Sequence, residues 1–312
     1  MEIEKIINEL KKVVYGKDEI LKKIILCQLS SGHVLLEDIP GVGKTTIALA
    51  FSKIMDLDYQ RMQFTSDVMP SDITGFKMYD KSKNEFVYQK GPILCNLFLA
   101  DEINRTSPRT QSALLEVMEE HSITIDGVQK HLEEPFLVIA TQNPFGSAGT
   151  NLLPQSQMDR FMICTSIGYP SREAEAGILE NKSKGNALET VNQIMNKQQL
   201  LQMREEVNNV FVDPAIHTYI VNLVNETRNN ESVAIGCSPR ASIAIMRLAK
   251  ANAYVENRDY VLPNDVKSVF VDACIHRLVL KVYDPSFVSK KRENILIEIL
   301  KKINEPNIKK PL

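Results

Sequence analysis

The chain has 312 residues, of which 44% are hydrophobic and 24% are charged, with a formal net charge of −2. This length is enough for one large domain or two ordinary domains, and we expect two. No apolar run approaches the length of a membrane span, and the first residues lack the long apolar stretch of a signal peptide. The small net charge, without a long basic block, argues against nucleic acid as the main partner. We therefore expect a globular cytosolic protein without a membrane span.

Five cysteines lie far apart in the sequence, mostly between apolar residues: Cys27, Cys95, Cys164, Cys237 and Cys274. This pattern predicts buried free thiols. The five histidines form no pair at ligand spacing with one another or with a cysteine, so a zinc site has little support.

Residues 1 to about 170 alternate short apolar runs with helical patterns, which is typical of a parallel sheet wrapped by helices. The predicted helices of this part are Asp18–Leu29, Thr45–Met55 and Thr110–Glu120. The predicted strands are Val34–Glu37, Tyr59–Phe64, Leu97–Asp101, Phe136–Thr141 and Phe161–Ser166. We therefore predict an α/β fold, a three-layer αβα domain with a parallel five-stranded sheet.

From Ser171 onward the sequence shows helical patterns and almost no strand signal. Proline follows Asp213, Ser238 and Leu262, and each pair predicts a helix start with proline early in the first turn. We expect a smaller all-α domain here, with the two domains at residues 1–180 and 181–312. The boundary could fall anywhere between residues 170 and 196.

A glycine-rich segment follows the first predicted strand: Asp38-Ile39-Pro40-Gly41-Val42-Gly43-Lys44-Thr45. Glycine lets backbone N–H groups approach phosphate oxygens, Lys44 would place a charge on the outer phosphates, and the Thr45 hydroxyl suits a magnesium ion. The general pattern has glycine at the position of Asp38, so the first turn of the loop departs from it. A chance match between a strand and a helix is the alternative. The predicted nucleotide-binding residues here are Pro40, Gly41, Val42, Gly43, Lys44, Thr45 and Thr46.

Two acids, Asp101 and Glu102, end the third predicted strand. In a nucleotide hydrolase, Asp101 would hold the magnesium shell and Glu102 could polarise the attacking water as general base. Alone the pair is weak support, because a buried strand often runs into a charged turn. When a phosphate-binding loop precedes it in the sequence, the pair strongly supports a nucleotide hydrolase.

Three segments together resemble the MoxR family of AAA+ ATPases: Gly32–Asp38, Leu99–Arg105 and Ala140–Pro144. In that family an acidic residue often stands at the position of Asp38, so the departure from the general loop pattern favours the resemblance. The motifs occur in the expected order. The resemblance covers nearly the whole chain, from residue 14 to the helix after Pro239.

The resemblance implies roles for three further residues. Asn143 occupies the place of the sensor 1 residue, which orients the water, although a simple Asn143-Pro144 turn is the alternative. Arg160 matches the arginine finger, which reaches the nucleotide of the neighbouring subunit, whereas the sequence alone favours an ion pair with Asp159. Arg240 resembles sensor 2 and would contact the γ-phosphate from the helical domain; a solvated arginine near a helix start is the alternative.

The resemblance also gives weaker assignments. Val14, Tyr15 and Gly16 resemble the segment that packs on adenine. Arg105 and Arg277 fall where relatives often have charged residues near subunit interfaces.

Two hairpins are predicted within the first domain. Phe76–Tyr79 and Glu85–Tyr88 flank a polar loop, and Ser122–Ile125 and Val128–Leu132 flank an Asp-Gly turn. They resemble insertions that point toward the central pore of the ring in the clade that holds MoxR, magnesium chelatase and the replicative helicases. Two surface hairpins without a substrate role are the alternative.

The resemblance implies an ATP hydrolase that uses ATP and Mg²⁺ and forms a homo-oligomeric ring, usually of six subunits. Such relatives remodel or mature client proteins, often with a von Willebrand factor A domain partner. Two other functions stay open. One is a motor subunit of a chelatase-like or nucleic-acid-acting complex, and the other is a nucleotide-dependent scaffold in which turnover is incidental.

Overall fold

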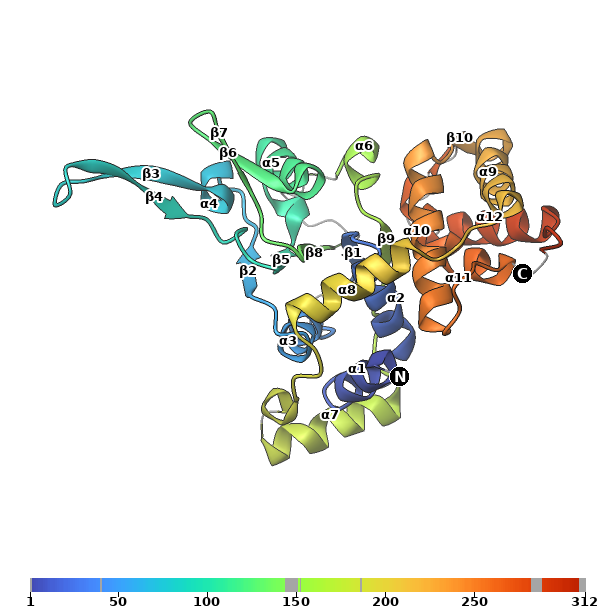
Figure 1. The fold of residues 1–312 in the computed structure, drawn as a ribbon, viewed down its shortest axis with the longest axis horizontal. Coiled ribbons are helices and arrows are strands. Elements are labelled where there is room, and N and C mark those ends of the chain that lie inside the picture. The colour runs from blue at the N-terminus through green and yellow to red at the C-terminus, as the bar shows by residue number, and fades with distance from the viewer. Residues whose placement is uncertain are drawn as a thin grey trace. The chain divides into compact units, whose positions relative to one another are not determined.

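The computed structural model describes residues 2–39, 41–143, 151, 153–185, 187–281 and 288–308 (Figure 1). The chain divides into two compact units and passes between them more than once. The sheet unit holds Met1–Lys23, His33–Leu153 and Thr165–Leu201. The helical unit holds Ile24–Gly32, Pro154–Cys164 and Gln202–Leu312. A single boundary after residue 180 stays a prediction.

A five-stranded sheet with the order β2-β5-β8-β1-β9 forms the centre of the sheet unit. Strand β5 pairs in parallel with β2 and β8, and β8 pairs in parallel with β1. The strands are β1 (Val34–Glu37), β2 (Tyr59–Gln63), β5 (Leu97–Asp101), β8 (Leu137–Gln142) and β9 (Ile163–Thr165). Strands β1, β5 and β8 are almost fully buried, which explains their continuous apolar runs. The predicted parallel sheet is confirmed.

The helices of the sheet unit are α1 (Glu2–Lys11), α3 (Lys44–Ile54), α4 (Pro70–Thr74), α5 (Pro108–Glu120) and α7 (Arg172–Lys184), with short 3-10 helices η1 (Ile103–Arg105) and η2 (Ala187–Thr190). Helix α5 shows why these residues form a helix. Ser107 caps its first turn by accepting from the N–H of Thr110, and Pro108 supplies a preset backbone angle at the first position. Helix α3 begins directly after the glycine-rich loop, as predicted.

Both predicted hairpins are present. Strands β3 (Gly75–Asp80) and β4 (Glu85–Lys90) pair antiparallel, as do β6 (Ser122–Ile125) and β7 (Val128–His131). The β6–β7 turn has positive φ angles at both central residues, 49° and 78°, as its Asp-Gly sequence predicts. Figure 1 shows β3–β4 as a long ribbon that extends away from the sheet.

The helical unit is built mainly from α9 (Pro214–Asn229), α10 (Pro239–Val255), α11 (Pro263–Cys274) and α12 (Val288–Lys302), with α6 (Gln155–Met158) and η3 (Ile275–Arg277). Helices α2 (Asp18–Leu29) and α8 (Lys197–Asn208) contribute residues to both units. All three predicted proline starts are confirmed. An antiparallel pair of strands, β10 (Val233–Ile235) and β11 (Val279–Leu280), was not predicted, because runs of two or three residues show no alternation.

The five cysteines are buried and none forms a disulfide, as predicted. Burial raises the pKa of the Cys95 thiol to about 12. This thiol therefore stays protonated near neutral pH and packs as a small apolar side chain.

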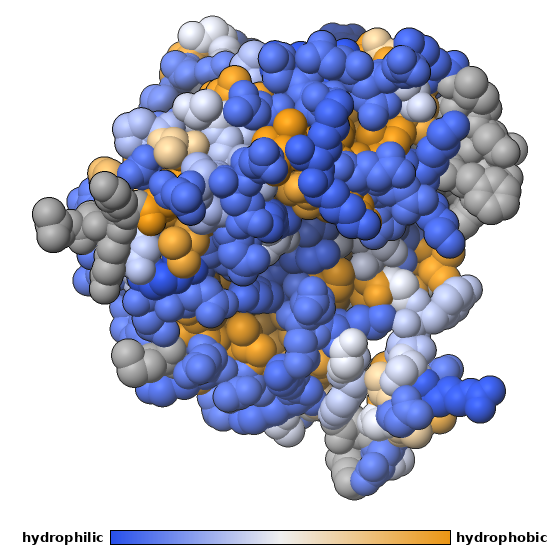
Figure 2. All heavy atoms as spheres, turned by 90° about the vertical axis from the view of Figure 1, so that its right-hand side faces the viewer, coloured by the Kyte–Doolittle hydropathy of each residue, from blue (hydrophilic) through white to orange (hydrophobic). Residues whose placement is uncertain are grey.

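The molecular face in Figure 2 is largely hydrophilic, and its hydrophobic residues form separate patches. In the part of the chain that the structure describes, no helix combines the length and the apolarity needed to cross a membrane.

A buried carboxylate, Asp265, holds together the start of α11 and the residues before it. Asp265 is 1% exposed. It accepts hydrogen bonds from Asn252 Nδ2 at 2.7 Å, from both terminal nitrogens of Arg258 at 2.7 and 2.6 Å, and from the N–H of Leu262 at 2.7 Å.

We expect Asp265→Ala to lower the free energy of unfolding of the helical unit by about 3–5 kcal/mol, because it leaves these donors without their acceptor. Urea denaturation followed by circular dichroism measures the loss. The matched control is Asp259→Ala, which removes an exposed carboxylate from the same unit and should change stability by about 0.5 kcal/mol or less. Equal losses in the two variants would contradict the structural role of Asp265.

Candidate active site

The carboxyl ends of three adjacent strands bring the predicted polar residues together. The register pairs Glu37 of β1 with Gln142 of β8, and Gln142 Nε2 donates to Glu37 Oε1 at 2.6 Å. Thr141 Oγ1 donates to Asp101 Oδ1 at 2.6 Å and accepts from the N–H of Glu102 at 2.9 Å. Thr141 is fully buried and fixes both acids, a role that the sequence analysis missed.

The glycine-rich loop joins β1 to α3 at this edge. Gly41 and Gly43 have φ angles of 87° and 95°, in the left-handed region that favours glycine. A Cβ atom at either position would meet no heavy atom within 4 Å, so the backbone angle and not crowding explains the glycine. Lys44 Nζ donates to the backbone oxygen of Asp38 at 3.0 Å. Pro40 lies outside the described residues.

The acid that departs from the general loop pattern has a defined structural role. Asp38 is 4% exposed, and its carboxylate accepts from the N–H groups of Ile167 and Gly168, the latter at 3.1 Å. Ser166 Oγ donates to the same carboxylate at 3.2 Å. Lys17 Nζ supports this segment by donating to the oxygen of Ile167 at 2.6 Å. Asp38 therefore ties the glycine-rich loop to the segment that follows β9.

The electrostatics of Lys44 identify the acids that lie near it. Burial lowers the pKa of this partly buried lysine, and the negative charges of Asp38, Asp101 and Glu102 partly offset that shift. All three acids are therefore within electrostatic reach of the ammonium group. An anionic phosphate bound there would favour the charged lysine further.

Glu102 has a constrained backbone and side chain. Its φ and ψ angles of 56° and 49° are uncommon for a residue other than glycine, and such residues gather at functional sites. Its Oε2 accepts from Gln63 Nε2 and from Arg105 Nη1, each at 2.8 Å. Arg61 Nη2 donates to Asp101 Oδ2 at 2.8 Å.

The contacts of Arg61 and Gln63 with the acids were not predicted from the sequence. Both lie on β2, and the register places Gln63 beside Asp101 of β5. The sequence does show polar side chains at alternate positions near the end of that strand, which could have indicated a polar site. Without the strand order, this signal does not identify a partner.

A cavity of about 310 Å³ lies beside the glycine-rich loop. Of the predicted residues, its lining includes Val14, Tyr15, Gly41, Val42, Gly43 and Thr46. The lining also contains residues that were not predicted: Val13, Lys17, Pro170, Ile178, Gly185, Ala187 and Leu188. A partly open cavity with mostly apolar walls and a few polar groups suits a flat, partly apolar ligand.

Gly16 is not among the residues that line this cavity. Its φ angle is 65°, and a Cβ atom there would lie 3.4 Å from the Cβ atom of Ala174 on α7. The positive φ angle, more than crowding, therefore explains the glycine in the turn between α1 and α2. The predicted contact of Gly16 with adenine stays a prediction.

The remaining predicted residues divide between the two units. Asn143 follows β8 directly, and its backbone oxygen accepts from Asn104 Nδ2 at 3.3 Å, so it shares the edge with the acids. Arg160 follows α6 and Arg240 lies in the first turn of α10, both in the helical unit. The residues brought together at the sheet edge are therefore the loop, the acids and Asn143.

The donor set at this edge fits a magnesium ion bound together with phosphates. Thr45 in the first turn of α3 offers a hydroxyl, and Asp101 at the end of β5 offers a carboxylate. Mg²⁺ in phosphate sites prefers oxygen donors and takes one or two protein carboxylates, because water and phosphate supply the rest. Within the described ranges, no group of three or more His, Cys, Asp or Glu residues could hold a metal ion without such help.

Comparisons with known proteins cover both units. A model of the ATPase family associated with various cellular activities (AAA) matches residues 33–163, and an AAA lid domain model matches residues 225–299. The chain is 43% identical to the uncharacterized protein YeaC of Bacillus subtilis, over 97% of this chain and 94% of that protein. It is 39% identical to Chaperone MoxR1 of Mycobacterium tuberculosis, over 98% and 83%. A crystal structure of a candidate ATPase from Cytophaga hutchinsonii matches with a TM-score of 0.90 and 38% identity, over 98% and 95%.

We expect Asp38→Asn to weaken nucleotide binding about tenfold. The amide keeps the size of the side chain but cannot accept from both N–H groups with a full charge, and one charge-assisted hydrogen bond is worth about 1.5–3 kcal/mol. Titration with a fluorescent nucleotide measures the dissociation constant. Asp58→Asn is the control, because Asp58 is an exposed carboxylate whose ion pair with Lys197, at 2.7 Å, contributes little. Unchanged affinity in Asp38→Asn would show that the bonds to residues 167 and 168 do not shape the loop.

Proposed function

Because this chain belongs to the MoxR family of AAA+ ATPases, we propose that it binds ATP with Mg²⁺ beside the glycine-rich loop and hydrolyses it at the subunit interfaces of a homo-oligomeric ring, usually of six subunits. One observation carries this proposal most. The loop that carries Lys44 follows β1 and lines the cavity, and Asp101 and Glu102 stand at the end of β5, which only β8 separates from β1. This arrangement combines a phosphate-binding loop with the acids that hydrolysis needs.

The loop would bind the triphosphate. Backbone N–H groups from Gly41 to Gly43 and the start of α3 would face the phosphate oxygens, and Lys44 would hold the outer phosphates. Thr45 and Asp101 would hold Mg²⁺, which when bound neutralises charge on the phosphates. The adenine would lie against the apolar side of the cavity, next to Val14 and Tyr15.

Glu102 would remove a proton from the attacking water as general base. Its carboxylate is already directed by Gln63 and Arg105, and its backbone by Thr141, so little reorganisation precedes the reaction. Asn143 would orient the same water from the adjacent strand.

Two arginines of the helical unit complete the proposed mechanism. Arg160 would reach the nucleotide of the neighbouring subunit and stabilise the charge that develops on the transferred phosphoryl group. Arg240 would contact the γ-phosphate, so that ATP binding or loss moves the helical unit.

We further propose that hydrolysis drives chaperone-like remodelling or maturation of a client protein in the cytosol, together with a von Willebrand factor A domain partner. One relative is named a chaperone. The β3–β4 hairpin supports a protein client, because Phe76, Met78 and Phe86 are 47%, 52% and 69% exposed. Exposed apolar side chains that gather on one element often mark a surface for protein contacts.

We predict that Glu102→Gln keeps ATP binding but lowers turnover by about 10²–10⁴-fold, because glutamine has the size of the side chain without its basicity. Phosphate release at saturating ATP and nucleotide titration measure the two effects separately. Glu116→Gln, an exposed change on α5, is the control and should leave both unchanged. Hydrolysis by Glu102→Gln at the wild-type rate would refute the general base. An assembled wild type that binds ATP without turnover would favour a nucleotide-dependent scaffold.

A further inference from the structure

A buried guanidinium holds the backbone on both sides of Arg160. Arg277 is 3% exposed, and its Nη2 donates to the backbone oxygens of Asp159 at 3.0 Å and Phe161 at 2.7 Å. Its Nη1 donates to the oxygen of Met162 at 3.3 Å. Asp159 and Phe161 are the residues directly before and after Arg160. Arg277 therefore fixes the position from which the Arg160 side chain leaves the backbone.

The neighbouring histidine, His276, bonds to the same backbone segment. His276 Nε2 donates to the Phe161 oxygen at 3.0 Å, and the His276 oxygen accepts from Gln155 Nε2 at 2.8 Å. Burial lowers the pKa of His276 well below its usual value, and the charge of Arg277 acts in the same direction. The neutral imidazole with its proton on Nε2 is the form that makes this bond.

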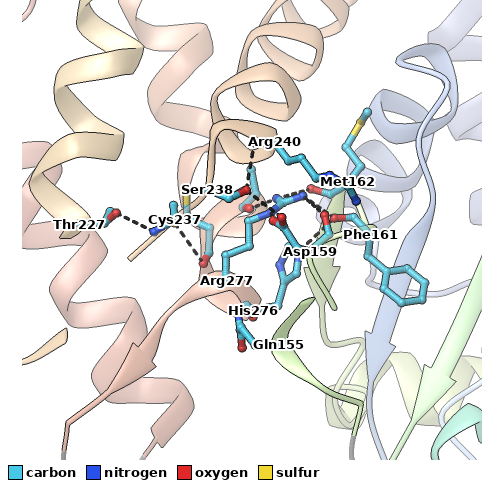
Figure 3. A network of polar contacts seen from close by, with 12 residues as sticks. Gln155, Asp159, Phe161, Met162, Thr227, Cys237, Ser238, Arg240, His276 and Arg277 are labelled. Carbon is cyan, nitrogen blue, oxygen red and sulfur yellow. Dashed lines mark hydrogen bonds and ion pairs between the residues drawn. The ribbon is translucent and has the colours of Figure 1, made fainter. Parts of the chain in front are cut away.

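The Asp159 carboxylate joins this segment to the start of α10 (Figure 3). Oδ1 accepts from Arg277 Nε and Oδ2 accepts from Ser238 Oγ, each at 2.7 Å. Ser238 is also the N-cap of α10, and its Oγ accepts from the N–H of Arg240 at 3.1 Å. The same carboxylate thus connects the backbone beside Arg160 to the first turn that carries Arg240.

Stability alone does not explain this ion pair. A buried pair is often no more stabilising than apolar residues of the same volume, because two charges must leave water. Here, however, the guanidinium contacts a carboxylate and several backbone oxygens, with Ala273 among them, in one fixed geometry. A planar guanidinium whose donors point in fixed directions specifies an orientation better than an apolar contact can.

We propose that Asp159, Ser238 and Arg277 form a connector that positions Arg160 and Arg240 relative to each other. The connector rests on the proposed function, in which Arg160 acts on the nucleotide of the neighbouring subunit. Ser238 and Arg277 are positioning residues and need not touch nucleotide themselves. A displacement of the first turn of α10 is passed through Asp159 to the Arg160 segment, so one subunit alters the catalytic site of the next.

Mixed rings test the connector directly. Acceptor subunits carry Arg160→Ala, so they keep an intact pocket but lack the finger. Donor subunits carry Lys44→Ala, so they keep the finger but lack the phosphate lysine. The mixture should hydrolyse ATP, whereas each variant alone should not.

The decisive donor carries Ser238→Asp in addition to Lys44→Ala. Aspartate remains a good N-cap, so α10 keeps its start, but it cannot donate to Asp159 and repels it. We expect these donors to lower kcat of the mixture about 10- to 100-fold, because a displacement of about 1 Å is enough for such a loss. The KM for ATP should stay the same, since the acceptor pockets are unchanged. Donors with Ser238→Thr, which keeps the hydroxyl, should rescue as well as the parent donor.

A second donor variant, Arg277→Lys, keeps the charge but cannot reach the carboxylate and the four carbonyls together, and it should fail in the same way. Light scattering and thermal melting of each mixture establish that rings form and that the donors are folded. Full rescue by Ser238→Asp or Arg277→Lys donors would overturn the connector. If the parent Lys44→Ala donor itself fails to rescue in assembled mixed rings, the finger role of Arg160 is wrong, and with it the proposed shared site.

Discussion

The site depends on one constraint, which is that adjacent parallel strands end at the same edge of a sheet. Strands β1, β5 and β8 are neighbours, so the residues that follow them must meet. The glycine-rich loop follows β1, the acids end β5, and Asn143 follows β8. The buried hydroxyl of Thr141 on β8 then bonds to the Asp101 carboxylate and to the backbone N–H of Glu102, and so links β8 to both of these residues. The chemistry proposed for this chain needs these groups within a few ångströms of one another, and the sheet order brings them to one edge.

Two largely buried carboxylates extend this constraint to distant parts of the chain. Asp38 joins the loop to the segment after β9 within the sheet unit, and Asp159 joins the segment of Arg160 to the start of α10 within the helical unit. Each accepts bonds from groups more than 70 residues away in sequence. Charged acceptors of this kind fix directions more strictly than apolar packing does. Motion of either unit would therefore displace the residues that we propose to act on the nucleotide together with the backbone.

Local patterns in the sequence were sufficient for much of the fold. The apolar runs located all five strands of the sheet to within a few residues, and proline after Asp213, Ser238 or Leu262 located helix starts. The glycine-rich loop and the pair of acids were identifiable because the residues of each motif are close together in the sequence. The partners of Asp38, Gln63 and Arg277 were not, because each bond joins elements that only the strand order or the helix packing brings together. The repeated passage of the chain between the two units was likewise not predicted, because no local pattern marks it.

We propose that ATP hydrolysis requires residues from two subunits. The most direct measurement is the specific ATPase activity as a function of protein concentration, with light scattering on the same samples. If the proposal is right, activity per subunit rises as rings assemble and then stays constant. Activity per subunit that is constant across the assembly transition, including dilute monomer, would contradict it.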